Sequence, residues 1–180
     1  MERRTFMSSL GKFAVGGLTA AAIFESLQPN YAWAQTVPKD DKDIKVGYET
    51  VESPAGNGTI KGYLAKPAKG KKFASVLVIH ENRGLNPYIE DVARRAAVDG
   101  FLALAPDGLF PAGGYPGNDD DGRTLQAGLD QAKLRTDMLN GARFVKAHKL
   151  STGRLGVTGF CWGGSTTNFL AAALGADMQA

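Results

Sequence analysis

Cysteine and histidine are both scarce in this sequence of 180 residues, which contains one cysteine and two histidines. A single cysteine excludes an internal disulfide, so Cys161 is a free thiol whose presence needs a reason. The formal net charge is only +3 and the lysines form no continuous basic stripe, so we expect no nucleic-acid partner. No repeat of solenoid length is visible, and 43% hydrophobic residues fit one globular domain.

Long hydrophobic runs are also missing, because the uncharged run Phe13–Phe24 is too short for a stable bilayer anchor. It follows Arg3-Arg4-Thr5-Phe6-Met7 and precedes the A-x-A motif Ala32-Trp33-Ala34. This order predicts an export signal over residues 1–34, cleaved before Gln35. The twin arginine resembles the Tat class. We therefore expect a periplasmic protein that meets the membrane only during export, with a Sec signal or an uncleaved anchor as alternatives.

The start of the remaining chain has the pattern of a linker followed by a hairpin. Residues 35–43 are polar, contain Pro38 and are predicted to form a linker or an ordered tail. Apolar and polar residues alternate over Ile44–Glu52 and Thr59–Lys66, on either side of the turn Ser53–Gly58. This alternation predicts two antiparallel, half-buried strands.

Two further segments, Phe73–Ile79 and Phe101–Pro106, are apolar on both faces. Strands of this kind are typical of a parallel sheet covered by helices. The helix between them is expected to begin at the N-cap Asn86 and Pro87, and to stop at Gly100. The order strand, helix, strand predicts a right-handed parallel unit.

A glycine- and proline-rich stretch, Asp107–Gly122, is predicted to be a loop. Its acid triplet Asp119-Asp120-Asp121 is interpreted as a solvated turn, since the spacing matches no calcium loop. Residues Thr124–His148 have a helical pattern, which fits two helices or one helix kinked near Gly141.

The most informative stretch is Val157–Gly164, where an apolar run ends in Gly-x-Cys-x-Gly and the helical segment Ser165–Leu174 follows. This is the strand, turn and helix pattern of a nucleophile elbow. Cys161 at its centre is expected to have a strained backbone, for which the flanking glycines leave room. Its sulfur would lie at a helix N-terminus, where unpaired N–H groups favour negative charge. The alternative is a buried cysteine in a glycine-rich turn.

A second polar cluster, His80-Glu81-Asn82-Arg83-Gly84, follows the first buried strand, at the sheet edge where α/β proteins bind ligands. Val78–Leu85 and Gly159–Gly164 together resemble the dienelactone hydrolase (carboxymethylenebutenolidase) family. The segments Ala93–Ala96 and Ala105–Leu109 support this resemblance, which covers roughly residues 44–180. It implies a partial α/β-hydrolase fold, with a mostly parallel sheet, helices on both faces and an N-terminal antiparallel hairpin.

The resemblance also implies site residues for an esterase or lactonase. Cys161 would be the nucleophile that forms a thioester acyl-enzyme, and Glu81 would accept its proton. The backbone N–H groups of Trp162 and Asn82 would form the oxyanion hole. For Glu81 the alternative is a salt bridge to Arg83 or Arg95.

Neither histidine is expected to act as the general base. His80 is interpreted as a packed residue at a strand end, and His148 as a partner of a helix C-terminus. In the family the catalytic Asp and His follow the nucleophile, and both would lie beyond Ala180, because Asp177 is too close to Cys161. We therefore expect the 180-residue chain to be inactive. The strand before Cys161 would then have an unpaired edge through which chains could self-associate.

The expected substrate is a small-molecule ester or lactone, and no cofactor or metal is expected. The loop Phe110–Asn118 has no arginine where the family's carboxylate clamp would lie, which weakens the case for a dienelactone substrate. A general carboxylesterase or peptidase of the same fold, and a non-catalytic binding module, remain alternatives.

Overall fold

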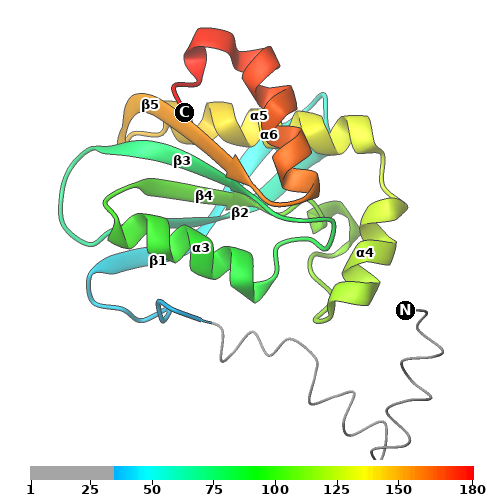
Figure 1. Ribbon diagram of the computed structural model, residues 1–180, viewed down its shortest axis with the longest axis horizontal. Coiled ribbons are helices and arrows are strands. Elements are labelled where there is room, and N and C mark those ends of the chain that lie inside the picture. Colours follow the sequence, from blue (N-terminus) through cyan, green and yellow to red (C-terminus); the bar gives the residue numbers. More distant parts are fainter. Residues whose placement is uncertain (1–34) are drawn as a thin grey trace, which may run out of the picture. The chain divides into compact units, whose positions relative to one another are not determined.

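The structure is a computed structural model that describes residues 35–180 (Figure 1). The predicted export signal, residues 1–34, lies outside this part. The strands are β1 (Ile44–Ser53), β2 (Gly58–Pro67), β3 (Phe73–Ile79), β4 (Leu102–Pro106) and β5 (Ser151–Gly159). The helices are α3 (Pro87–Val98), α4 (Asp119–Ala127), α5 (Gln131–Ala147) and α6 (Trp162–Leu174), with 3-10 turns at η1 (Phe110–Ala112) and η2 (Gly175–Asp177).

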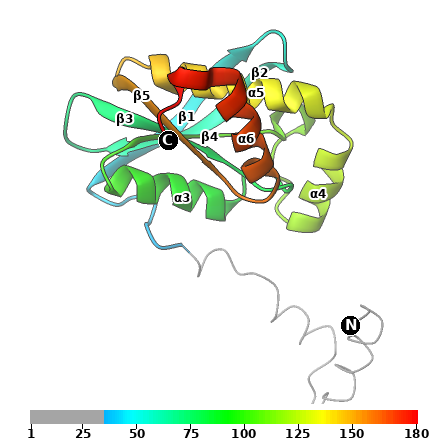
Figure 2. The same cartoon turned by 45° about the horizontal axis from the view of Figure 1, so that its top comes forward.

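The five strands form one mixed sheet in the order β1-β2-β4-β3-β5. The hairpin strands β1 and β2 are antiparallel, β2 joins β4 antiparallel, and β3 lies parallel to both β4 and β5. Helix α3 packs on one face, and α5 and α6 pack on the other (Figures 1 and 2). The predicted α/β class, with helices on both faces and an N-terminal hairpin, is confirmed.

Local signals placed the first elements correctly. Strand β1 extends one residue beyond the end of its predicted segment, β2 extends one residue at each end, and β3 has the predicted bounds. Helix α3 begins at Pro87, and the Asn86 side chain accepts a hydrogen bond from the Ile89 N–H at 3.1 Å. The chain leaves the helix through Gly100, which has φ +96°, a conformation that favours glycine.

The loop prediction for Asp107–Gly122 is wrong at its end, because α4 begins at Asp119. Asn118 caps this helix by accepting from the Asp121 N–H at 2.9 Å. The acid triplet therefore lies in the first turn, where carboxylates interact favourably with the helix dipole. It is not a solvated turn.

Of the two alternatives predicted for residues 124–148, two helices is confirmed, and one helix kinked near Gly141 is wrong. The chain leaves helical structure between α4 and α5, where Asp130 caps α5 by accepting from the N–H groups of Ala132 and Lys133. Gly141 lies inside α5, and a Cβ there would come 2.9 Å from Cγ of Pro106. Close packing on the sheet, and not a kink, explains this glycine.

Two apolar layers make the core. Between the sheet and helices α5 and α6 lie Leu77, Leu104, Met138, Val145 and Leu155, among others. Between the sheet and α3 a second cluster includes Ile44, Tyr63, Val78, Ile89 and Ala97. Fully burying a side chain of this size contributes about 1.5–3 kcal/mol, so both faces of the sheet hold the fold together.

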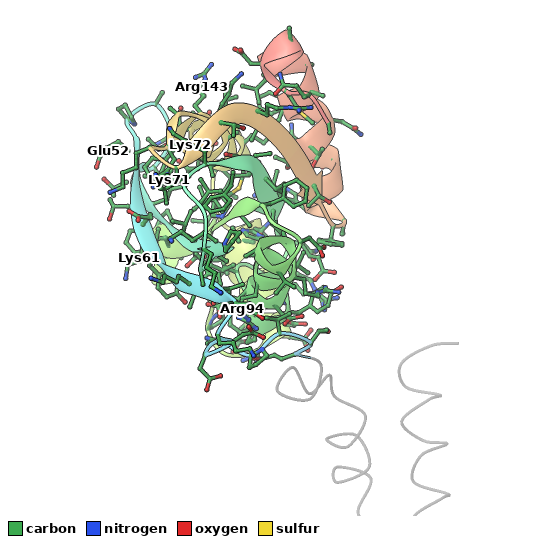
Figure 3. The ribbon with its side chains drawn as sticks, turned by 90° about the vertical axis from the view of Figure 1, so that its left-hand side faces the viewer. Glu52, Lys61, Lys71, Lys72, Arg94 and Arg143 are labelled. Atoms are coloured by element: carbon green, nitrogen blue, oxygen red, sulfur yellow. The ribbon has the colours of Figure 1, made fainter. Side chains whose placement is uncertain are left out.

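The segment of residues 35–43, predicted as a linker or an ordered tail, packs onto α3. Val37 is buried, and its N–H donates to Asp91 at 2.9 Å while its carbonyl accepts from Arg94 at 2.6 Å. The guanidinium of Arg94, the residue labelled in Figure 3, is fully buried. It also donates to the hydroxyl of Tyr63 at 3.2 Å. A buried charge needs such partners, so this segment is integral to the folded unit.

Strand β5 lies at one edge of the sheet, and the end of the chain runs along it. The Gln179 N–H donates to Leu155, and the Val157 N–H donates to Ala180, both at 2.8 Å. The predicted row of unpaired groups is therefore absent at these two positions. An apolar hollow of about 430 Å³ lies beside this edge and is lined by Val76, Phe101 and Val157, among others.

Within residues 35–180, no helix has both the length and the apolarity to cross a bilayer.

Candidate active site

Cys161 occupies the turn between β5 and α6. Strand β5 ends at Gly159 and α6 starts at Trp162. Cys161 has φ 53° and ψ −111°, and among the described residues it is the only non-glycine with positive φ. Its side chain is exposed and makes no disulfide. The predicted elbow geometry is therefore confirmed, and a non-glycine residue in such strained geometry suggests a functional constraint.

Two glycines let the elbow close. A Cβ on Gly159 would collide with the carbonyl of Gly163. A Cβ on Gly163 would lie 2.5 Å from the carbonyl oxygen of Ile79 and 2.6 Å from that of His80. The first turn of α6 thus packs directly on the backbone at the end of β3. Gly164 has more room, since a Cβ there would be 3.5 Å from the nearest carbonyl oxygen, that of Gly159.

The same packing brings the two predicted motifs to one edge of the sheet. Ile79 and Gly159 are paired at the ends of the parallel strands β3 and β5, and Phe160 N–H donates to the Ile79 carbonyl at 3.3 Å. Glu81 and Cys161 each follow this pair by two residues. Their backbones therefore leave the sheet side by side, at the edge where α/β proteins bind ligands.

Both predicted oxyanion-hole amides are available. Neither the Trp162 N–H nor the Asn82 N–H donates a hydrogen bond to another residue in the range 35–180. For Trp162 this follows from its place as the first residue of α6, because the first N–H groups of a helix have no partner within it. The role of these two amides as oxyanion donors stays a prediction. The catalytic roles of Cys161 and Glu81 also stay predictions.

The salt-bridge alternative for Glu81 finds no support in the described residues. Arg83 pairs with Asp119 at 2.6 Å, and Arg95 pairs with Asp91 at 3.2 Å. No ion pair joins Glu81 to either arginine among residues 35–180.

His80 is fully buried behind the site. The Gly108 N–H donates to its Nε2 at 3.1 Å, so Nε2 must be the unprotonated nitrogen. Nδ1 then carries the proton and donates to the Glu81 carbonyl at 2.5 Å. Burial lowers the pKa of His80 to about 4, so the ring is neutral at pH 7. With both nitrogens engaged, His80 cannot act as the base for Cys161.

His148 lies at the C-cap of α5, the dipole position expected for it. Its Nδ1 accepts from the Leu150 N–H at 3.2 Å, and desolvation lowers its pKa. Asp177 forms an ion pair with Lys146 at 2.8 Å. Neither residue is arranged to serve the elbow.

A further residue, Asp107, directly follows β4 at the same edge of the sheet. Its carboxylate accepts from the Leu109 N–H at 3.0 Å. Burial raises the pKa of Asp107 to about 6. From the sequence, Asp107 is predicted only to lie in a loop, with no role in the site. The sequence feature that could have indicated a role for Asp107 is its position directly after a buried strand, at the same sheet edge as Glu81.

No cluster of three or more His, Cys, Asp or Glu side chains within residues 35–180 is arranged to hold a metal ion. At this edge the chain carries the thiol of Cys161, and Glu81 with its carboxylate and the two predicted backbone donors follow the ends of the neighbouring strands. Such a set fits nucleophilic attack on an acyl carbon.

The chain is similar to several known proteins. The family model "Dienelactone hydrolase family" matches residues 60–180. A protein of Escherichia coli K12 described as "Putative hydrolase fragment YghX" is 59% identical over 114 residues, which cover 63% of this chain and 97% of that protein.

A "Putative carboxymethylenebutenolidase" of Methylorubrum extorquens is 36% identical over 77% of this chain and 49% of its own length. The crystal structure of the dienelactone hydrolase-like promiscuous phosphotriesterase P91, from metagenomic libraries, has a TM-score of 0.61 and 25% identity. It covers 76% of this chain and 57% of that one. The chain thus spans about half the length of its carboxymethylenebutenolidase relatives, and it belongs to the dienelactone hydrolase family.

Proposed function

We propose that this protein hydrolyses a carboxylic ester or lactone through a cysteine acyl-enzyme formed on Cys161. The single observation that supports this most strongly is the strained, exposed cysteine between β5 and α6, with φ 53°. Family membership makes a small-molecule ester or lactone the expected substrate class.

The proposed chemistry has two halves. Glu81 takes the thiol proton as the sulfur attacks the carbonyl carbon, and the N–H groups of Asn82 and Trp162 stabilise the oxyanion. The C–O bond to the leaving group breaks, and the alkoxide takes up the proton that Glu81 accepted from the thiol. Water then cleaves the thioester, which releases the acid and restores the thiol.

The second half needs a base that activates water, and imidazole is the commonest one. Both histidines of this chain are engaged elsewhere, His80 with Glu81 and Gly108 and His148 with Leu150. We therefore propose that the 180-residue chain accumulates the acyl-enzyme and turns it over slowly.

Incubation with p-nitrophenyl acetate tests this proposal. We expect an acetyl group on Cys161, located by peptide mass spectrometry, and slow loss of that group. The Cys161→Ala variant should carry no such adduct. Acetylation spread over lysines with none on Cys161 would refute the proposal.

A second substrate class comes from one relative. P91 is described as a promiscuous phosphotriesterase, and its fold matches this chain. A panel of a p-nitrophenyl ester, a lactone, a peptide anilide and a phosphotriester, each scored for the Cys161 adduct, separates these classes. An adduct with the phosphotriester and none with the esters would make phosphotriester cleavage the better proposal.

Export is a separate proposal, supported by the twin arginine and by Ala32-Trp33-Ala34. The side chain of the predicted mature start, Gln35, accepts a hydrogen bond from Arg94, and the N–H groups of the next two residues donate to Asp91. Cleavage after Ala34 would therefore leave these contacts intact. N-terminal sequencing of the periplasmic fraction should give a start at Gln35, and replacement of Arg3 and Arg4 by lysine should stop export by the Tat route.

A further inference from the structure

His80 makes contacts to three separate parts of the site. Its Nδ1–H donates to the Glu81 carbonyl at 2.5 Å, and its Nε2 accepts from Gly108 at 3.1 Å. Its ring also stacks on that of Trp162, with centroids 5.5 Å apart and planes 16° from parallel. The loop after β3, the loop after β4 and the first residue of α6 therefore meet at one fully buried side chain.

The bond to Glu81 fixes a particular peptide group. The Glu81 carbonyl and the Asn82 N–H belong to the same planar unit, and no peptide bond in the described chain is cis. In a trans peptide the C=O and N–H point in opposite directions. A hydrogen bond that holds the Glu81 oxygen toward His80 therefore aims the Asn82 N–H away from it.

The stack on Trp162 fixes the second donor. Trp162 is the first residue of α6, and its indole N–H donates to the Gln131 side chain at 3.2 Å. The indole is thus held between His80 and the start of α5. Its own backbone N–H, the other predicted oxyanion donor, cannot shift without disturbing this contact.

Gly108 leaves the space that the imidazole ring of His80 occupies. A Cβ on Gly108 would lie 2.7 Å from Nε2 and 3.1 Å from Cε1 of His80. Only glycine at this position lets the ring approach the backbone and accept its hydrogen bond. Neutral imidazole suits the place, because one nitrogen must donate and the other must accept.

We propose that His80 is a positioning residue, which sets the direction of the Asn82 N–H relative to Trp162 and so aligns the oxyanion hole. The inference rests on the proposed function, since it concerns the stabilisation of an oxyanion at Cys161. His80 exchanges no proton with the substrate in this role.

The test compares two reactions of the same thiol. Acylation by p-nitrophenyl acetate passes through a tetrahedral oxyanion, whereas alkylation by iodoacetamide is a direct displacement with no oxyanion. A variant that disturbs only the oxyanion hole slows acylation and leaves alkylation nearly unchanged. A variant that damages the elbow or the fold changes both.

His80→Phe keeps a ring for the stack but loses both hydrogen bonds, and His80→Asn keeps a short-chain donor for the Glu81 carbonyl. We expect His80→Phe to slow acylation at least about tenfold, as loss or misdirection of an oxyanion donor does, with alkylation within about twofold of the parent. His80→Asn should recover part of the acylation rate.

Gly108→Ala provides a second route if the His80 variants do not fold, because its Cβ would displace the imidazole while His80 itself is unchanged. It should lower the ratio of acylation to alkylation in the same direction. Equal loss of both reactions in every variant, or no loss of acylation in a folded one, would overturn the inference. Absence of acylation in the parent chain would instead refute the proposed function.

Discussion

The imidazole of His80 lies against the indole of Trp162, with ring planes 16° apart and centroids separated by 5.5 Å. This contact links the loop after β3 to the first residue of α6, and so links the two sequence motifs through their side chains. The backbone gives a second link, because Gly163 touches the carbonyls of Ile79 and His80. The elbow and the loop therefore form one structural unit.

Gly163→Ala should disrupt this unit. The new Cβ would lie 2.5 Å from the Ile79 carbonyl oxygen, and backbone atoms cannot move away cheaply. We expect a loss of about 1–3 kcal/mol in the free energy of unfolding, measured by urea denaturation. Gly164→Ala is the matched control, since its Cβ would meet Gly159 at an ordinary 3.5 Å. Equal effects of the two substitutions would contradict the packing described here.

The pH dependence of stability should contain two opposing contributions. His80 has its pKa lowered from 6.5 to about 4 by burial. Between these values the unfolded chain binds the proton more readily, so acidification destabilises the fold by roughly 1.4 kcal/mol per pH unit. Asp107 has its pKa raised from 3.8 to about 6 by burial, with Glu90 adding to the rise and Lys61 opposing it. Between these two pKa values the folded chain binds the proton more readily than the unfolded chain, so acidification stabilises the fold.

Between about pH 4 and 6 these two contributions should nearly cancel. Asp107→Asn removes the stabilising one. We therefore expect the stability of this variant to fall more steeply on acidification than that of the parent, by roughly 1.4 kcal/mol per pH unit. Urea denaturation at several pH values measures this difference. Parallel curves for variant and parent would show that Asp107 does not titrate as described.

Asp137 on α5 should be important for the hairpin. Its carboxylate accepts from the Ser53 hydroxyl at 2.6 Å and from the backbone and side-chain amides of Asn57 at 3.0 and 2.5 Å. Asp137→Ala would leave these donors unpaired and mostly buried. We expect a loss of about 2–4 kcal/mol in the free energy of unfolding. Asp120→Ala removes an exposed pair with Arg123 and should cost less than about 1 kcal/mol.

The contact between α3 and residues 35–37 should also matter for stability. Arg94→Ala would remove the fully buried guanidinium that lies 3.3 Å from Asp91, and would leave this buried carboxylate with only the partly exposed Arg95 at 3.2 Å. Breaking a buried ion pair in this way costs about 3–5 kcal/mol. Arg95→Ala is the control, because the Arg95 side chain is 39% exposed. A chain that begins at Pro38 should lose stability as Arg94→Ala does, and an unchanged melting temperature would show that residues 35–37 are dispensable.

Local sequence signals were sufficient for much of the fold. Alternation placed β1 and β2, and Asn86 with Pro87 marked the start of α3, because caps act within a few residues. Gly141 left two helices and one kinked helix as alternatives, since a glycine within a helical pattern can mark a kink or a close contact. Only the position of Pro106, on a different element, distinguishes the two.

For the site, Cys161 could be located because the glycines that relieve its turn lie beside it in the sequence. The role of His80 could not be predicted in the same way. It depends on Gly108 and Trp162, which the fold brings to the ring from distant parts of the chain. The pairing of Gln179 with β5 likewise depends on the turn that follows α6.

The most direct test of the central claim, that Cys161 is the nucleophile, is the amount of p-nitrophenolate released in the first phase of the reaction with p-nitrophenyl acetate. One equivalent per chain, followed by a slow phase and absent in Cys161→Ala, is the predicted result. No first phase, or one that persists in Cys161→Ala, would contradict the claim.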